Sequence, residues 1–320
     1  MKKDSYRFAV LSDIHMDLED GGKKIYFINA EKNFKLALDV IKSLGCDFII
    51  SAGDQVTNAT GATEEWKLYR KLISASGYTG QVFSALGNHE LRFAKYGGCT
   101  VADCHREFID YTGLADKPIS RPSGKTYYSY IEPIFGDAFI FMSLEIGADT
   151  NLIDNFSDEQ IDWAEELLER YHDEGRRVFL IQHAPIYGFG AGDDTSSPAY
   201  EGSIHLCEDS GAVFKNNRRF YELVKRYRDV IWLSGHTHVD LQEGVNYYHD
   251  DSCHALHIPS LAGSTRMKTD ADGNRYLDRK FYDDSAQGYI ADADAEKVVF
   301  KGIDFLSGKM YPQYVYTIKR

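Results

Sequence analysis

The sequence has no long apolar run, few cysteines and no excess of basic residues, and each absence excludes a class of protein. No stretch approaches the ~20 apolar residues of a membrane-spanning helix. The first apolar run ends at Leu11, too short for the core of a secretory signal peptide, so we expect a cytoplasmic protein. The five cysteines are odd in number and include no CxxC pair, so we expect reduced packing residues. The spacing of Cys99 and Cys104 by itself indicates neither a disulfide nor a metal site.

The charge balance argues against a nucleic-acid-binding surface. The chain has 36 Lys and Arg residues against 49 Asp and Glu residues, a formal net charge of −13. Affinity for nucleic acid depends on basic side chains that neutralise phosphates, so we do not expect this class of partner. A small anionic substrate is still compatible if cations attract it locally. With 320 residues and 43% hydrophobic residues, the chain can build a large core, and we expect a single domain over residues 1–320.

Five apolar runs each stop at residues that can carry chemistry. The runs and the residues after them are 8–12 before Asp13-Ile14-His15, 48–52 before Gly53-Asp54, 82–86 before Gly87-Asn88-His89-Glu90, 178–182 before His183, and 230–234 before Gly235-His236-Thr237-His238. Apolar runs of this length are typical of strands that are covered on both faces. Helical periodicity near 34–44 and 63–76 separates the first three runs, which predicts βαβ units and parallel pairing. The carboxyl ends of such strands meet in one crevice, so these residues are expected to share a site.

The remaining segments predict a second sheet and two loops. Residues 127–144 have the pattern of a hairpin, and Ser157 with Gln160 predicts a capping box at the start of the next helix. Residues 187–217 and 264–284 are polar and show little periodicity, so we expect loops at the mouth of the site. Residues 288–320 predict a C-terminal β segment.

The residue types at the strand ends suit a metal site. Asp13 with His15, and His236 with His238, are pairs two residues apart, which places both side chains of a pair on one side of an extended backbone. Each motif alone has a structural alternative: a turn at Asp54, a helix cap at 88–89, a core histidine at 183. All five motifs stand at the same end of their strands, and this favours a shared site over coincidence.

Together, the five blocks resemble the calcineurin-like metallophosphoesterases. The match is ordered and spans residues 13 to 238. The resemblance implies an α/β fold, a four-layer α/β/β/α sandwich with two mixed central sheets flanked by helices. It also implies two metal ions. Their ligands would be Asp13, His15, Asp54 and His238 for the first ion, and Asp54, Asn88, His183 and His236 for the second.

The implied activity is hydrolysis of a phosphate ester. Imidazole, carboxylate and amide ligands without thiolate favour Mn, Fe, Zn or Co. A hydroxide between the two ions would attack phosphorus, and His89 would assist the leaving group. We expect a small phosphorylated substrate, such as a nucleotide, and a position in the cyclic-nucleotide phosphodiesterase-like and related phosphohydrolase branch. The alternatives are a nuclease of the same fold and a non-catalytic metal-binding scaffold.

One position departs from the family pattern. Many members carry an acid three residues after the bridging aspartate, where it orients the histidine that corresponds to His89. This chain has Thr57 there, so Glu90, Asn58 or a backbone carbonyl is left to orient His89. The purple acid phosphatase branch has a metal-binding tyrosine at this position, and Thr57 argues against that branch.

The sequence leaves the contacts to the substrate open. The basic side chains near the motifs, Arg92, Lys95, Arg266 and Lys268, could contact phosphate or could be solvated surface charges. Three aromatic residues in the first loop, Tyr187, Phe189 and Tyr200, could cover a ring of the substrate or pack the loop.

Overall fold

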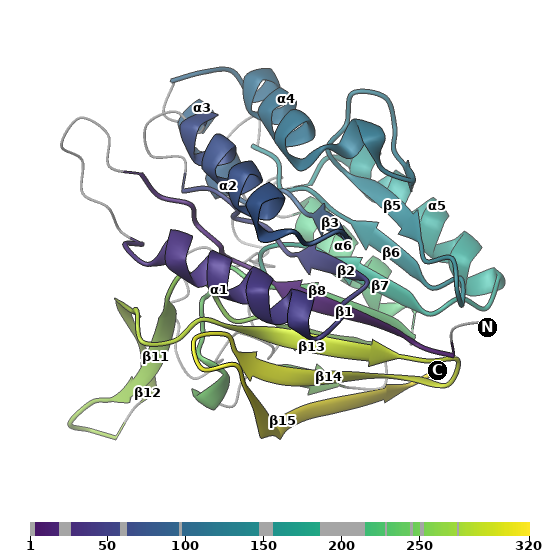
Figure 1. Ribbon diagram of the computed structural model, residues 1–320. Coiled ribbons are helices and arrows are strands. Elements are labelled where there is room, and N and C mark those ends of the chain that lie inside the picture. Colours follow the sequence, from purple (N-terminus) through teal and green to yellow (C-terminus); the bar gives the residue numbers. More distant parts are fainter. Residues whose placement is uncertain are drawn as a thin grey trace.

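Two large mixed sheets face each other, with helices on their outer sides (Figure 1). The computed structural model describes residues 4–18, 27–57, 63–95, 98–146, 156–185, 215–227, 229–243, 246–249, 253–273 and 275–320. This arrangement is the four-layer α/β/β/α sandwich predicted from the sequence, which is confirmed.

The first sheet has six strands within the described residues. In spatial order they are β15 (Lys309–Lys319), β14 (Lys297–Asp304), β13 (Gln287–Ala293), β1 (Tyr6–Leu11), β2 (Phe48–Ser51) and β3 (Gln81–Ser84). The pairs β1–β2 and β2–β3 are parallel, because a helix connects each pair, while β13, β14 and β15 add an antiparallel half. The C-terminal residues predicted as strands therefore extend the sheet that begins at the N-terminus.

The second sheet has seven strands in the part of the chain that is described. In order they are β4 (Ile119–Ser120), β5 (Tyr128–Ile131), β6 (Ala138–Phe141), β7 (Val178–Ile181), β8 (Val230–Ser234), β10 (His254–His257) and β9 (Tyr247–His249). The expected hairpin is β5–β6, and β6, β7, β8 and β10 pair in parallel. A separate ribbon is formed by β11 (Ser264–Thr269) and β12 (Arg275–Tyr282).

Helices cover the outer faces of both sheets. Those described are α1 (Ala30–Ser43), α2 (Thr63–Ser76), α3 (His89–Lys95), α4 (Val101–Thr112), α5 (Asp158–Asp173) and α6 (Lys215–Lys225), with short 3₁₀ turns at Leu114–Asp116 and Leu241–Glu243. Figure 1 places α1 and α2 in front of the first sheet and α5 and α6 behind the second. None of these described helices has both the length and the apolar character needed to cross a bilayer.

Aromatic rings fill the space between the sheets. The ring of Phe8 on β1 lies 5.7 Å from Phe139 on β6 and 5.6 Å from Phe179 on β7, in both cases edge to face. Phe48 on β2 meets Phe139 in the same way at 5.5 Å. Offset and edge-to-face pairs of this kind add to the free energy gained by burial. This aromatic core holds the strand ends of the two sheets opposite each other.

Two local features differ from the sequence prediction. Helix α4 is not predicted by periodicity, although its Thr100 and Asp103 form a reciprocal capping box. Ser157 caps α5 as expected, but the side chain of Gln160 bonds to the backbone of Ser143 instead of closing the box. Gln160 is buried, and the two backbone groups of Ser143 give its amide better partners than a helix end does.

The two predicted loops have different outcomes. Residues 264–284 were expected to be a loop but contain the β11–β12 ribbon, because antiparallel pairing satisfies their backbone groups despite the polar sequence. The other segment, 187–217, lies outside the described residues except for the start of α6.

We predict that Phe8→Ala lowers the free energy of unfolding by about 3–5 kcal/mol, because it removes a fully buried ring from the contact between the sheets. Chemical denaturation followed by circular dichroism measures this change. Val315→Ala is the control, since Val315 is 44% exposed and should change stability by less than about 0.5 kcal/mol. Equal effects of both substitutions would contradict the prediction.

Candidate metal centre

The eight predicted site residues lie together where five strands end. They follow the strands in this way: Asp13 and His15 after β1, Asp54 after β2, Asn88 and His89 after β3, His183 after β7, and His236 and His238 after β8. Strands β1, β2 and β3 are parallel neighbours in one sheet, and β7 and β8 are parallel neighbours in the other. Their carboxyl ends therefore open toward the same space.

The first group of donor atoms comes from Asp13, His15 and His238. The Nε2 atom of His238 lies 3.0 Å from Asp13 Oδ1 and 3.0 Å from His15 Nε2. The distance from His15 Nε2 to Asp13 Oδ1 is 3.7 Å. All three side chains are buried. These atoms are close enough to bind one ion together.

The second group of donor atoms comes from Asp54, Asn88, His183 and His236. The Nε2 atom of His183 lies 3.0 Å from Asp54 Oδ2 and 3.1 Å from Asn88 Oδ1. His236 Nδ1 lies 3.0 Å from the same amide oxygen. Asp54 Oδ2 is also 3.7 Å from His15 Nε2, so this carboxylate stands between the two groups.

Backbone carbonyls fix the tautomers of two histidines. His183 Nδ1 donates to the carbonyl of Ala52 at 3.0 Å, and His238 Nδ1 donates to the carbonyl of Gly263 at 2.9 Å. A carbonyl oxygen can only accept a hydrogen bond, so each Nδ1 carries the proton. Each Nε2 is thereby turned toward the centre, where it can bind a metal ion once it carries no proton. This is the second contact that metal-binding histidines usually make.

The clustered donor atoms are better satisfied by bound cations than by one another. Asp13 Oδ1 is buried without a hydrogen-bond partner, and ring nitrogens of His183 and His236 lie 3.1 Å and 3.0 Å from the same amide oxygen of Asn88. Burial opposes a charge on His183, but the adjacent Asp54 carboxylate raises the pKa of His183 to about 9. The pocket therefore attracts positive charge, and its nitrogen and oxygen donors suit divalent transition metals.

The backbone at these residues is unusual and corrects one prediction. Five non-glycine residues in the described ranges have positive φ: Asp13 (52°), His15 (46°), Asp54 (54°), His236 (73°) and His238 (58°). The sequence predicts an extended backbone at the i, i+2 pairs, and this prediction is wrong. Instead, each residue lies in the left-handed region, which costs about 1–3 kcal/mol and clusters at functional sites. These turns let both ligands of a pair, such as Asp13 and His15, point toward the centre although the strand has already ended.

Close packing explains two of the motif glycines. Gly53 has φ of 121°, and a Cβ there would lie 2.5 Å from Nδ1 of His183. A Cβ on Gly87 would collide with Oδ1 of Asp54. The backbone must pass this close for the ligand side chains to converge, so only glycine fits.

A sequence model of the calcineurin-like phosphoesterases matches residues 6–240. The chain belongs to this family. The structure resembles a dimetal phosphatase from Danio rerio, with 13% identity, a TM-score of 0.61 and 99% of each chain covered. It also resembles a purple acid phosphatase from yellow lupin, with 15% identity, a TM-score of 0.59 and coverage of 99% of this chain and 54% of the lupin chain. At such identities the likeness concerns the fold. No curated protein sequence matches the chain significantly.

In this member of the family, a backbone carbonyl orients His89. Its Nδ1 lies 2.8 Å from the carbonyl oxygen of Thr57, and its backbone N–H donates to Asp54 Oδ1 at 2.9 Å. Of the three partners left open by the sequence, the backbone carbonyl is therefore the one observed. Burial lowers the pKa of His89 to about 3, so the ring is neutral near pH 7 in the bare protein. The Nε2 atom remains available to a ligand.

Glu90 holds the backbone that carries the central aspartate. Its Oε1 accepts from the N–H of Gln55 at 2.6 Å, while its Oε2 accepts from Gly87 at 2.7 Å and from Asp54 at 3.1 Å. One buried carboxyl group thus ties the loop after β2 to the loop after β3. Glu90 is part of a predicted block, but spacing alone gave no sign of this role.

The basic residues near the motifs are largely engaged elsewhere. Arg266 forms ion pairs with Asp284 and, at 3.8 Å, with Asp240, and Lys268 pairs with Asp278 at 2.5 Å. These pairs favour surface roles over phosphate binding. Arg92 on α3 is close enough to His89 to lower its pKa, and Lys95 is exposed at the end of the same helix. The aromatic residues at 187, 189 and 200 lie outside the described residues.

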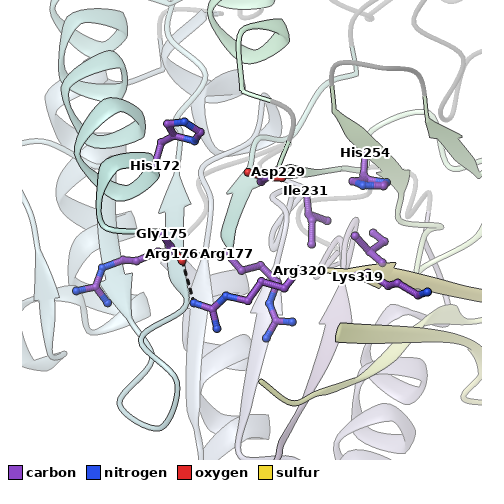
Figure 2. A pocket seen from close by; sticks show the side chains of 10 residues that line it. His172, Gly175, Arg176, Arg177, Asp229, Ile231, His254, Lys319 and Arg320 are labelled. Atoms are coloured by element: carbon purple, nitrogen blue, oxygen red, sulfur yellow. Dashed lines mark hydrogen bonds between the residues drawn. The ribbon is translucent and has the colours of Figure 1, made fainter. Parts of the chain in front are cut away.

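A cavity of about 120 Å³ lies at the amino ends of β7 and β8, the opposite edge from the metal centre (Figure 2). Basic side chains surround it, and the three arginines among them already have partners. Arg177 is buried and pairs with Asp137, and Arg320 donates to the carbonyl of Gly175, as the dashed line shows. The cations of this cavity are used to hold the fold together.

Sequence reasoning missed two phenylalanines at the centre. The ring of Phe27 stacks on His15 with centroids 4.2 Å apart, and the ring of Phe281 lies 4.9 Å from that of His238. Neither residue belongs to a motif or a strand end that the sequence singles out. Their positions depend on how α1 and the β11–β12 ribbon pack, and no local signal reports that.

We predict that Glu90→Gln weakens metal binding at least tenfold, because the new amide group would turn N–H toward a backbone N–H donor and loosen the loop of Asp54. Calorimetric titration of the metal-free protein with Mn²⁺ measures the affinity. Glu64→Gln is the matched control, on the exposed face of α2. An unchanged affinity in Glu90→Gln would show that the clamp does not support the centre.

Proposed function

We propose that the chain is a hydrolase that uses two metal ions to cleave a phosphate ester of a small molecule. The observation that carries this proposal is the pair of overlapping donor groups at the strand ends, in a chain of the calcineurin-like phosphoesterase family. By its motifs we group it with the cyclic-nucleotide phosphodiesterase-like and related phosphohydrolases.

The two donor groups suggest which residues would hold each ion. The first ion would be held by Asp13, His15, Asp54 and His238, and the second by Asp54, Asn88, His183 and His236. The distances within each group are compatible with this division, and Asp54 lies between the groups, where it can contact both ions. The donors favour Mn, Fe, Zn or Co.

The charge of the loaded centre would attract a phosphate. Two divalent cations bring a charge of +4, and the ligands contain two carboxylates, Asp13 and Asp54, with a combined charge of −2. The other five donors are neutral when they bind metal, so about +2 remains. A local positive charge in a chain with net charge −13 explains how an acidic protein can bind an anionic substrate.

When bound, the two ions would acidify a water molecule and neutralise charge on the phosphate. The residue proposed to handle a proton is His89. Its Nδ1–H is used by the carbonyl of Thr57, so Nε2 can donate only when the ring carries a second proton. An anionic phosphate beside the ring would favour that form. His89 would then hold a proton at Nε2 for the oxygen of the leaving group.

The first test is a substrate panel. We expect hydrolysis of p-nitrophenyl phosphate, bis-p-nitrophenyl phosphate or 2′,3′-cyclic nucleotides with Mn²⁺, and loss of that activity after chelation. The preferred compound distinguishes a monoesterase from a diesterase. Hydrolysis of DNA or RNA instead would point to a nuclease, and bound metal without turnover of any compound would point to a scaffold.

The second test separates metal binding from catalysis. We predict that His89→Ala keeps its metal but loses about 10²- to 10⁴-fold in kcat, since general acid assistance is worth this much. Asp54→Asn is the comparison and should lose metal as well as activity. Metal content by elemental analysis and steady-state kinetics measure both. Loss of metal in His89→Ala would refute the assignment of its role.

A further inference from the structure

Two phenylalanine rings, which also contact each other, pack against the first donor group. Phe27 stacks on His15, with centroids 4.2 Å apart and planes 9° from parallel. Phe281, near the end of β12, lies 4.9 Å from Phe27 and 4.9 Å from His238. Phe27 is 6% exposed, whereas Phe281 is 43% exposed. The rings thus lead from the buried histidines to the surface.

Other contacts fix Phe281 at this place. Phe281 lies close to Gly263, since a Cβ added to Gly263 would be 3.6 Å from the Cβ of Phe281. The carbonyl of Gly263 in turn orients His238. The side chain of Asn29 donates to Asp283 at 3.2 Å, which ties the segment after Phe27 to the end of the ribbon. Figure 1 shows the ribbon standing beside the start of α1. Phe281 is therefore joined to the rim of the centre from two sides.

The exposure of Phe281 needs an explanation. Large apolar side chains gain free energy on full burial, so an open ring forgoes part of this gain. Phe27 already covers His15 and lies 5.7 Å from His238, so the histidines have an aromatic cover without Phe281. Four other large apolar side chains in the described residues are more than a third exposed, but none of them is aromatic. An exposed ring that contacts the centre is suited to a ligand.

We propose that Phe281, backed by Phe27, is a platform for an aromatic ring attached to the phosphate of the substrate. Aryl and nucleoside phosphate esters would then be bound in preference to small alkyl esters. The platform offers a π face and no hydrogen-bond donor, so it selects for a planar ring and not for a particular base. This inference rests on the proposed function, because it requires the phosphorus atom to lie at the metal centre.

Two phosphonates test the platform without depending on turnover. Calorimetric titration of the Mn²⁺-loaded protein compares phenylphosphonate with methylphosphonate, which share the anionic group and differ in the ring. We expect phenylphosphonate to bind about threefold to tenfold more tightly, as a stacked aromatic pair allows. In Phe281→Ala the ratio of the two Kd values should fall to near one, and in Phe281→Tyr it should be retained.

The controls separate this inference from the proposed function. Val315→Ala removes another exposed apolar side chain, on β15, and should leave the ratio as in the natural chain. Damage to His238 in Phe281→Ala would weaken both compounds equally, which does not change their ratio. Equal binding of both compounds by the natural chain, or a preference that survives Phe281→Ala, overturns the platform alone. If neither compound binds and no ester is hydrolysed, the proposed function fails and the platform with it.

Discussion

The structure depends on a set of buried and partly buried nitrogen and oxygen donor atoms held close together. His183, Asp54, Asn88 and His236 meet at distances of 3.0–3.2 Å, and Asp13, His15 and His238 form a similar group beside them. Such an arrangement is unfavourable without positive charge between the atoms. Left-handed backbone at five of these residues adds strain. Metal binding would offset both costs, so the stability of this part of the fold should be coupled to the metal.

The rest of the fold maintains this arrangement through backbone groups. Carbonyls of Ala52, Gly263 and Thr57 orient three of the imidazoles, and the carboxylate of Glu90 binds amides of two loops. These contacts come from segments that are rigid because the strands before them are buried. The aromatic core between the sheets sets the separation of the two groups of strand ends.

Phosphate affinity and substrate choice have separate origins in this proposal. Arg266 and Lys268, two basic side chains of the β11–β12 ribbon, pair with aspartates. The positive charge that attracts an anion would come from the metal ions. Selectivity would come from a neutral aromatic surface next to them. The centre can therefore recognise a phosphate ester without a basic surface patch.

The sequence by itself predicted the parallel strands and helices that carry the five motifs, and the convergence of the residues after those strands. Apolar runs that end in Asp, His and Asn report both burial and chemistry, so the sequence predicted that these eight residues lie together, and the family resemblance of the blocks implied the four layers. Tertiary structure alone decided how those residues meet. The left-handed turns, the carbonyl that orients His89, the clamp at Glu90 and the rings of Phe27 and Phe281 follow from contacts between distant segments. Every residue has the same backbone carbonyl, so the sequence does not mark which carbonyl will accept a hydrogen bond from a site residue. Packing between distant segments leaves no periodic pattern along the chain, so the sequence does not reveal these contacts either.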